Sequence, residues 1–219
     1  NAVFERDVAI RLVLIANEDQ IIFTDAASDG YTSDNVNLLI SENQARLDTV
    51  IGPGNYDIGH VFDGRPSFGG FSFQGVASRG SVCLNGFKAR GVNLVRGLPP
   101  SSTIAYYSAA HEMGHQFGAS HTFNATSGTC GTQRASSTAY EPGTGSTIMG
   151  YRFACAPEDM MSSDTYFHTA SIEQIVAYTT VGGGSTCPVL TVTGNNIPTV
   201  DAGLTYTIPQ STPFILTAT

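Results

Sequence analysis

The stretch HEMGHQFGASH, from His111 to His121, holds three of the chain's five histidines and one glutamate. At about 100° per residue, His111 and His115 lie one turn apart on the same face of a helix. Two imidazoles at i and i+4 can both ligate one Zn²⁺ at about 2.0–2.1 Å. Glu112 projects to the side of that face, where it can accept a proton from a zinc-bound water and later deliver it to a leaving amine.

Gly118 explains why the third histidine follows so soon. A continuing helix would carry residue 121 away from the metal, whereas glycine can adopt positive φ, end the helix and reverse the chain. His121 can then return to the same zinc from another direction. Three protein ligands leave one coordination position for water, as in catalytic rather than closed structural zinc sites. A solvated helix end with incidental histidines is the competing interpretation, and it gives no reason for the spacing.

Composition argues against several classes of function. The chain has 219 residues, 41% of them hydrophobic, which is enough for one sizeable domain with a small appendage. The formal net charge of −8 and the single lysine, Lys88, speak against a nucleic-acid or anionic-membrane partner. No apolar run approaches the length of a membrane span. Without a close Cys-x-x-Cys pair, a cysteine-based zinc site is not indicated either.

The N-terminal part of the chain predicts strands around one helix. Residues 8–17 (VAIRLVLIAN) are apolar and β-branched and predict a buried strand, and residues 21–25 predict a short one. Apolar positions at helical spacing predict a helix over residues 34–50. Residues 56–62 (YDIGHVF) predict another strand. Strand, helix and strand in this order imply a crossover, and hence an α/β (α+β) fold with a mainly parallel sheet.

The middle of the chain surrounds the histidine helix with irregular structure. Residues 64–97 are glycine-rich and contain short β-like pieces, and residues 98–102 (LPPSS) break the chain before that helix. A loop rich in Ser, Thr and Gly covers about residues 122–164. Apolar residues at helical spacing then predict a last helix over about residues 171–178.

The C-terminal end differs in composition from the rest. Residues 181–186 (VGGGST) resemble a linker, and the following residues are rich in Thr, Val, Ile and Pro. These residues suggest a few short strands, too few to close a sandwich alone. We therefore divide the chain into a catalytic domain, residues 1–187, and residues 188–219 as linker and start of a truncated β-rich (Ig-like) domain.

The histidine motif resembles that of the metzincin zinc peptidases. The matching residues are His111, Glu112, His115, Gly118 and His121. That family also has a methionine turn under the metal, and STIMGY (residues 146–151) matches it, with Met149 as a hydrophobic floor and not a ligand. Ordinary core packing of Met149 is the alternative, and it predicts nearly the same environment.

Within the metzincins, residues 1–187 resemble the reprolysin (adamalysin) branch. NAVFERDVAIRLVLI (residues 1–15) resembles the end of that fold's first helix running into its second strand, and FQGVAS (residues 73–78) resembles its substrate-binding edge strand. AHEMGHQFGASHTFN, EPGTGSTIMGY and DTYFH look most like secreted bacterial reprolysin-like peptidases. The resemblance implies a zincin-like domain with a twisted, mostly parallel sheet, an antiparallel edge strand, an active-site helix and a Met-turn. It also implies that substrate pairs with Gly75, Val76 and Ala77.

Two residues depart from the pattern of animal reprolysins. Those enzymes follow the third histidine with aspartate, whereas this chain has Thr122, and they have proline where this chain has Tyr151. A tyrosine at that place resembles astacins, serralysins and pappalysins, and in the first two it stabilises the oxyanion, a role that Tyr151 would then share. Packing of Tyr151 near the site without catalytic effect is the equal alternative. HTF after the motif also resembles pappalysins.

The resemblance further implies that a strand and a long helix usually precede NAVFERD. We expect that these elements were removed or remain associated as a separate piece, which makes a propeptide or N-terminal segment a candidate partner.

Four cysteines favour disulfides over free thiols, and hence an oxidising compartment. They allow three pairings. Cys130 and Cys155 both lie around the Met-turn, so we pair them. Cys83 with Cys187 would then tie the edge-strand region to the chain's end, which resembles a bridge in adamalysins.

The remaining candidates are weaker. His60 and His168 are more easily explained as structural histidines, the second as a residue that caps or precedes the last helix. Glu158, Asp159 and Asp164 would suit Ca²⁺, although a solvated acidic surface explains them as well.

Together these observations predict a secreted zinc metalloendopeptidase. Protein or peptide substrate would add to the edge strand, a zinc-bound water activated by Glu112 would attack, and residues 151–157 would shape the pocket for the side chain after the cleaved bond. The alternatives are a pappalysin-like peptidase and a binding module or inactive fragment that retains zinc.

Overall fold

The computed structural model describes residues 1–25, 27–32, 35–64, 72–96, 103–151, 154–160, 163–194, 199, 201 and 203–215. The chain forms two compact units, Asn1–Pro188 and Val189–Thr219, and nearly all internal contacts belong to the first. In the described part of the second unit, no residue belongs to a helix or strand. The strands expected there from composition are absent from those residues.

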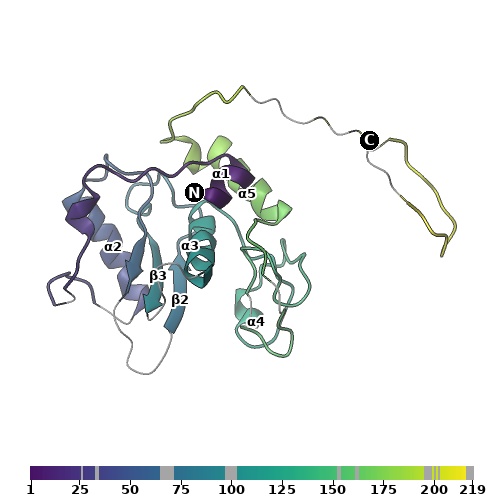
Figure 1. The fold of residues 1–219 in the computed structure, drawn as a ribbon, viewed down its shortest axis with the longest axis horizontal. Helices are drawn as coiled ribbons and strands as arrows, with labels where there is room; N and C mark the ends of the chain where they lie inside the picture. The colour runs from purple at the N-terminus through teal and green to yellow at the C-terminus, as the bar shows by residue number, and fades with distance from the viewer. Residues whose placement is uncertain are drawn as a thin grey trace. The chain divides into compact units, whose positions relative to one another are not determined.

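A three-stranded mixed sheet forms the centre of the first unit. Its strands are β1 (Val61–Asp63), β2 (Ser72–Ala77) and β3 (Gly91–Arg96), in the order β1-β3-β2. Strand β1 pairs with β3 in parallel, whereas β2 pairs with β3 antiparallel. The α/β class and the antiparallel edge strand are therefore confirmed. Helix α2 (Val36–Val50) covers one face of the sheet and helix α3 (Thr103–Gln116) the other (Figure 1).

The alternation of side chains along β3 explains how the two helices attach. Val92 and Leu94 are fully buried with Leu39 and Ile40 of α2. The intervening residue, Asn93, points to the other face, where its amide donates to the Ser108 hydroxyl of α3 at 2.6 Å. Because successive side chains of a strand point to opposite faces, one strand holds both helices in place.

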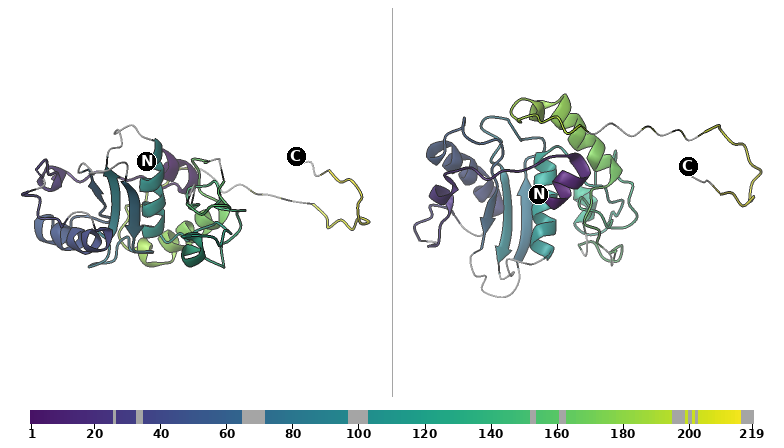
Figure 2. Two further views of the ribbon diagram at one scale, coloured as in Figure 1. Left: turned by 90° about the horizontal axis from the view of Figure 1, so that it is seen from below. Right: turned by 45° about the horizontal axis from the view of Figure 1, so that its top comes forward.

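A second apolar cluster supports the other side of α3. Phe4 of helix α1 (Ala2–Val8) lies with its ring centroid 5.3 Å from both Phe117 and Phe167. Ile175 of helix α5 (Thr169–Thr180) is fully buried in the same cluster. Figure 2 shows α1 and α5 next to α3 in two further views. The end of the histidine helix is thereby packed against both ends of the first unit.

Several predicted elements differ from the structure. Residues 8–17 form no strand: α1 ends at Val8, and Val13 and Leu14 are 80% and 81% exposed. An apolar, β-branched run favours a strand only where a partner strand completes its hydrogen bonds, and the described residues supply none here. Residues 21–25 also form no strand, because Ile21 ends the 3₁₀ turn η1 (Glu18–Ile21). The strand expected over residues 56–62 is reduced to β1.

The end of the first unit is more ordered than its composition predicts. Helix α5 begins after His168, whose Nδ1 accepts a hydrogen bond from the amide of Ala170 at 3.1 Å. Residues 181–186 are not a free linker, because they include the 3₁₀ turn η2 (Gly183–Ser185). Cys187 is then joined to Cys83, and Cys130, at the start of the short helix α4 (Cys130–Gln133), is joined to Cys155.

Candidate metal centre

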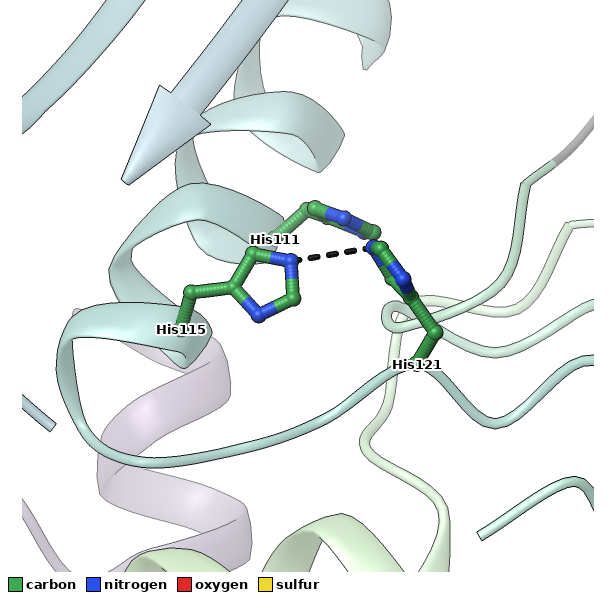
Figure 3. A group of neighbouring side chains, drawn as sticks. All are labelled: His111, His115 and His121. Carbon is green, nitrogen blue, oxygen red and sulfur yellow. Dashed lines mark hydrogen bonds between the residues drawn. The ribbon is translucent and has the colours of Figure 1, made fainter. Parts of the chain in front are cut away.

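Three histidines converge at the end of α3. His111 and His115 extend from the same face of the helix, and His121 approaches from the loop that follows (Figure 3). One ring nitrogen of each lies within 4.8 Å of the others. Among the described residues, this is the one group of histidine, cysteine or acidic side chains placed to hold a metal ion.

The turn at Gly118 produces this convergence. Helix α3 ends at Gln116, and Gly118 adopts φ +98°. The amide of Gly118 donates to the carbonyl of His115 at 2.8 Å, and the amide of Ala119 donates to the carbonyl of Gly114 at 2.9 Å. Such a left-handed residue after a helix reverses the chain and satisfies the last carbonyls. Glycine adopts this conformation without steric penalty, and so the chain can bring His121 back.

Backbone carbonyls fix the orientation of all three rings. The Nδ1 atoms of His111, His115 and His121 lie 2.6, 2.8 and 2.6 Å from the carbonyl oxygens of Ile148, Ala119 and Gln133. Because a carbonyl only accepts, each Nδ1 carries the hydrogen and donates it. Each neutral ring therefore has an unprotonated Nε2, the atom that a metal binds.

The donor set fits Zn²⁺. Nε2 of His115 and Nε2 of His121 lie 3.0 Å apart, and neither has a hydrogen to share in the neutral form. Two lone pairs at this distance repel each other unless a cation lies between them. Tetrahedral ligands with bonds of about 2.0–2.1 Å have their nitrogens about 3.3 Å apart, close to this spacing.

The surroundings also favour the neutral form that metal binding requires. Burial lowers the pKa of His111 well below its ordinary value, with further lowering by the neighbouring histidines. Burial and then the charge of His121 lower the pKa of His115 to about 3, and burial lowers the pKa of His121. Ligands that need no deprotonation lose nothing to proton competition near neutral pH.

Glu112 lies beside the triad but is held apart from it. Its side chain is 7% exposed, and burial raises the pKa of its carboxyl to about 8. The carboxyl lies against β2 at Gly75, where a Cβ atom would come within 2.3 Å of Oε1 of Glu112. A cation in the histidine site would lower this pKa again. Glu112 is therefore a titratable group placed next to both the metal site and the strand edge.

A cleft of about 370 Å³ joins the predicted substrate strand to the triad. Residues from the edge strand, the histidine helix, the loop after it and the Met-turn surround it: Gly75, Val76, Ala77, Arg79, Glu112, His115, Ser120, His121, Gln133, Ala135 and Tyr151. The structure thus brings together candidate residues from separate parts of the sequence. Arg79 and Gln133 were not singled out by sequence reasoning.

Tyr151 lines this cleft beside the third histidine. Its ring centroid lies 4.5 Å from that of His121 and 4.7 Å from that of Phe123. Burial, followed by the charge of Glu112, raises the pKa of Tyr151 to about 12. The phenol therefore keeps its proton at neutral pH and can donate it in a hydrogen bond.

Met149 is fully buried in the cluster that contains Phe117 and Phe167. A Cβ atom on Gly114 would lie 2.7 Å from its sulfur, so the methionine packs directly against the helix between the two ligands. Its carbonyl accepts from the amide of Thr122 at 3.2 Å. The Met-turn therefore supports both the helix and the returning chain.

Sequence reasoning missed Glu141, which connects these two segments. Its carboxylate accepts from the hydroxyl of Thr122 at 2.5 Å and from the hydroxyl of Thr147 at 2.6 Å. It also accepts from the amides of Ser146 and Thr147 at 2.9 and 3.0 Å. The absence of aspartate after His121 was the sequence signal that could have prompted a search for another carboxylate.

The other candidates have structural partners. His60 contacts Oε1 of Gln116 through Nδ1 at 2.9 Å and Oδ1 of Asn93 through Nε2 at 2.8 Å. Glu158 accepts from the amides of Thr126 and Ser127, and Asp159 from the amide of Cys155. Asp164 accepts from the Ser146 hydroxyl. These contacts explain the acidic residues and give no support to a calcium site.

Comparison with known families agrees with this geometry. Residues 1–179 match the family model described as metallo-peptidase family M12B, reprolysin-like. The matched range contains helix α3, strand β2 and residues 146–151. A search of curated proteins finds no match.

Proposed function

Because the chain belongs to metallo-peptidase family M12B, reprolysin-like, we propose that it is a zinc-dependent endopeptidase. The observation that carries this proposal is the convergence of three unprotonated Nε2 atoms beside a buried glutamate, in a cleft bordered by a strand edge. His111, His115 and His121 would hold the zinc. Met149 would support them from below.

Substrate would bind as an additional strand along β2. This strand pairs with β3 on one side only, which leaves its other edge open for a peptide in the described sheet. Gly75, Val76 and Ala77 lie along the cleft and would form the main-chain hydrogen bonds. Tyr151 and the segment that leads to Pro157 would shape the pocket for the side chain after the cleaved bond, with Arg152 and Phe153 outside the described residues.

Glu112 would serve as general base and then as general acid. Zinc, when bound, supplies a Lewis acid that polarises a carbonyl and lowers the pKa of water to about 7. The carboxylate of Glu112 would accept a proton from the attacking water and return it to the leaving amine. Tyr151, which keeps its proton, would donate a hydrogen bond to the carbonyl oxygen as that oxygen gains charge.

The two disulfides support a location outside the cytosol. Disulfides persist in oxidising compartments, and the described part of the chain contains no free cysteine. No helix among the described residues has the length and apolar character needed to cross a membrane. We therefore propose secretion, as for the bacterial peptidases that the chain resembles, with a propeptide as a candidate inhibitor.

Digestion of casein or gelatin, with and without a chelator, tests the proposal. We expect cleavage that the chelator abolishes and that added zinc restores. Glu112→Gln should keep bound zinc, measured by elemental analysis, and lose activity by at least about 10²-fold. Folded, zinc-loaded protein that cleaves none of a varied set of substrates would instead favour a binding module. Full activity in Glu112→Gln would refute the assignment of the base.

A further inference from the structure

Arg79 is a charged residue of the cleft that the proposed chemistry does not use. It follows β2 directly beyond Ser78 and lies on the cleft wall with Gly75 and Ala77. Its Nη1 donates to the hydroxyl of Ser120 at 2.5 Å. Helix α5 in turn fixes Ser120, because the amide of Ser120 donates to Oε1 of Gln174 at 2.8 Å. The guanidinium therefore has a fixed support although the residue is exposed.

No carboxylate neutralises this guanidinium in the part of the chain that the structure describes. The ion pairs there join Arg6 to Asp7 and Arg11 to Glu5. In a chain of net charge −8, an unpaired cation beside the substrate strand is available to an anion that comes from outside.

A second groove continues from the cleft at Arg79. Its volume is about 400 Å³, and Arg79 lines both spaces. Gly80, Gly118 and Tyr178 form part of its floor. Gly80 and Gly118 have positive φ, and the Tyr178 side chain packs against both of them, so backbone and the Tyr178 ring form this side of the groove. The two spaces together provide a path for one arm of a substrate past the guanidinium.

We propose that Arg79 selects an acidic side chain on the substrate arm that continues from β2 into this groove. The inference rests on the proposed function and adds a specificity to it. The contact of Glu112 with Gly75 marks the place of the cleaved bond, and Arg79 lies four residues further along the chain. In antiparallel pairing, the slightly more stable arrangement, that arm precedes the bond. At about 3.3 Å per residue, the acidic residue lies about two to four positions before the cleaved bond.

A purely structural role for Arg79 is the alternative to exclude. The amide of Gly80 donates to the carbonyl of His115 at 2.8 Å, so this turn lies at the C-terminal end of α3. A cation there also stabilises the helix dipole. That role would affect stability, and it would not distinguish acidic from neutral peptides.

Matched peptides test the proposal in the full chain. Each pair carries Glu or Gln at one position before or after a cleaved bond found by digestion of casein. At one of the positions about two to four residues before the bond, we expect kcat/KM to be about 3- to 10-fold higher for the Glu peptide than for the Gln peptide. In Arg79→Gln, this Glu-to-Gln ratio of kcat/KM should approach one. The effect should lie mainly in KM. Binding of the same pairs to zinc-loaded Glu112→Gln, followed by fluorescence anisotropy, should show the same preference without turnover.

Arg90→Gln provides the matched control. Arg90 directly precedes β3 and pairs with Ser78, next to Arg79, but its guanidinium bonds the Ser78 hydroxyl and lies over Phe87, outside the cleft lining. The Glu-to-Gln ratio should stay unchanged in this variant. An equal ratio in the unmodified protein, a preference that survives Arg79→Gln, or one confined to positions after the bond overturns the role of Arg79 while cleavage itself stands. Absence of cleavage together with absence of selective binding overturns both proposals.

Discussion

Thr122 shows how a substitution in a motif can be compensated elsewhere in the chain. At this position animal reprolysins carry aspartate, whereas here the hydroxyl donates to the carboxylate of Glu141. The same carboxylate receives three further hydrogen bonds from Ser146 and Thr147 of the Met-turn segment. The negative charge behind the third histidine is thus retained, but it comes from residue 141.

Replacing this carboxylate tests its structural role. The carboxylate of Glu141 accepts two backbone amides on Oε1 and two hydroxyls on Oε2. In Glu141→Gln the amide oxygen can still accept from the two amides, and the hydroxyls can turn to accept from the NH₂, but four charge-assisted hydrogen bonds become weaker neutral ones. We expect unfolding free energy at pH 7, from urea titration, to fall by about 2 kcal/mol. Thr138→Ser, a nearby change that keeps the hydroxyl bonded to the His121 carbonyl, should cost far less.

The same variant predicts a pH dependence. Hydrogen bonds from Thr122, Thr147 and Ser146 lower the pKa of Glu141 against the opposing effect of burial. A depressed folded-state pKa stabilises the protein above the unfolded pKa of about 4.3, and the contribution is lost as pH falls through the folded value. The stability gap between the wild type and Glu141→Gln should therefore be constant near neutrality and narrow below about pH 4. Parallel curves down to pH 3 would contradict this, since histidine titration cancels in the difference.

Gly75 provides a prediction about the position of the base. A Cβ atom there would overlap the Glu112 side chain at 2.3–2.6 Å, so Gly75→Ala must displace the carboxyl. Misplacement by about 1 Å can lower a rate by about 10²-fold, and we expect a loss of about 10- to 100-fold in kcat. Zinc content and thermal stability should change little. Gly54→Ala, where a Cβ atom meets nothing within 4 Å, is the control and should retain full activity.

At the scale of elements, the turn after α3 connects helix geometry to metal affinity. In Gly118→Ala the residue would keep φ near +98° at a penalty of about 1–2 kcal/mol, and its Cβ would lie 3.1 Å from Cβ of Tyr178. Relief of this strain moves the segment that carries His121. We expect zinc affinity, from competition with a chromophoric chelator, to fall about 10-fold or more.

Gly86→Ala separates backbone strain from its effect on the site. Gly86 has φ +78°, and a Cβ atom there meets nothing within 4 Å. This variant should lose similar stability and keep its zinc affinity. Equal losses of affinity in both variants would show that the turn at Gly118 has no special part in placing His121.

Elements with a local signal were predictable from the sequence, and those that depend on distant partners were not. The helix predicted over residues 34–50 matches α2 because its apolar spacing and its partner face on β3 agree. The strand predicted over residues 8–17 was wrong because strand propensity does not provide a paired neighbour. Helix α5 begins at Thr169, before the predicted start near residue 171, because His168 caps it by accepting a hydrogen bond from the amide of Ala170.

The candidate site divides in the same way. The positions of His111, His115 and His121 follow from helix periodicity and one glycine, so eleven consecutive residues contain the signal. The positions of the partners around these histidines do not follow from the local sequence. The Gln133 carbonyl and Glu141 reach the site only through the folding of the loop. Gly75 of β2 is likewise a neighbour of Glu112 of α3 through the packing of the helix on the sheet, and not along the chain. Contacts of this kind have no periodic signature in one sequence.

At the scale of the whole molecule, two disulfides constrain different parts of the first unit. Cys83–Cys187 spans 104 residues and ties the segment after β2 to the end of the unit. Cys130–Cys155 spans 25 residues and lies inside the larger loop. The inner bridge begins at α4, whose last residue, Gln133, holds the ring of His121 through its carbonyl. The outer bridge has no such connection to a ligand among the described contacts.

The two bridges should therefore differ in what their removal changes. With the inner loop closed, the outer bridge restrains about 80 residues, so loop entropy predicts a loss of about 4.5 kcal/mol for Cys83→Ala/Cys187→Ala and about 3.5 kcal/mol for Cys130→Ala/Cys155→Ala. The loss of zinc affinity should instead be larger when the inner bridge, Cys130–Cys155, is removed. Loosening a residue that orients a ligand lowers affinity by about 10-fold or more, and this applies to the inner bridge alone. Denaturant titration and chelator competition on both variants measure the two quantities, and a single order shared by both would contradict a separate role for the inner bridge.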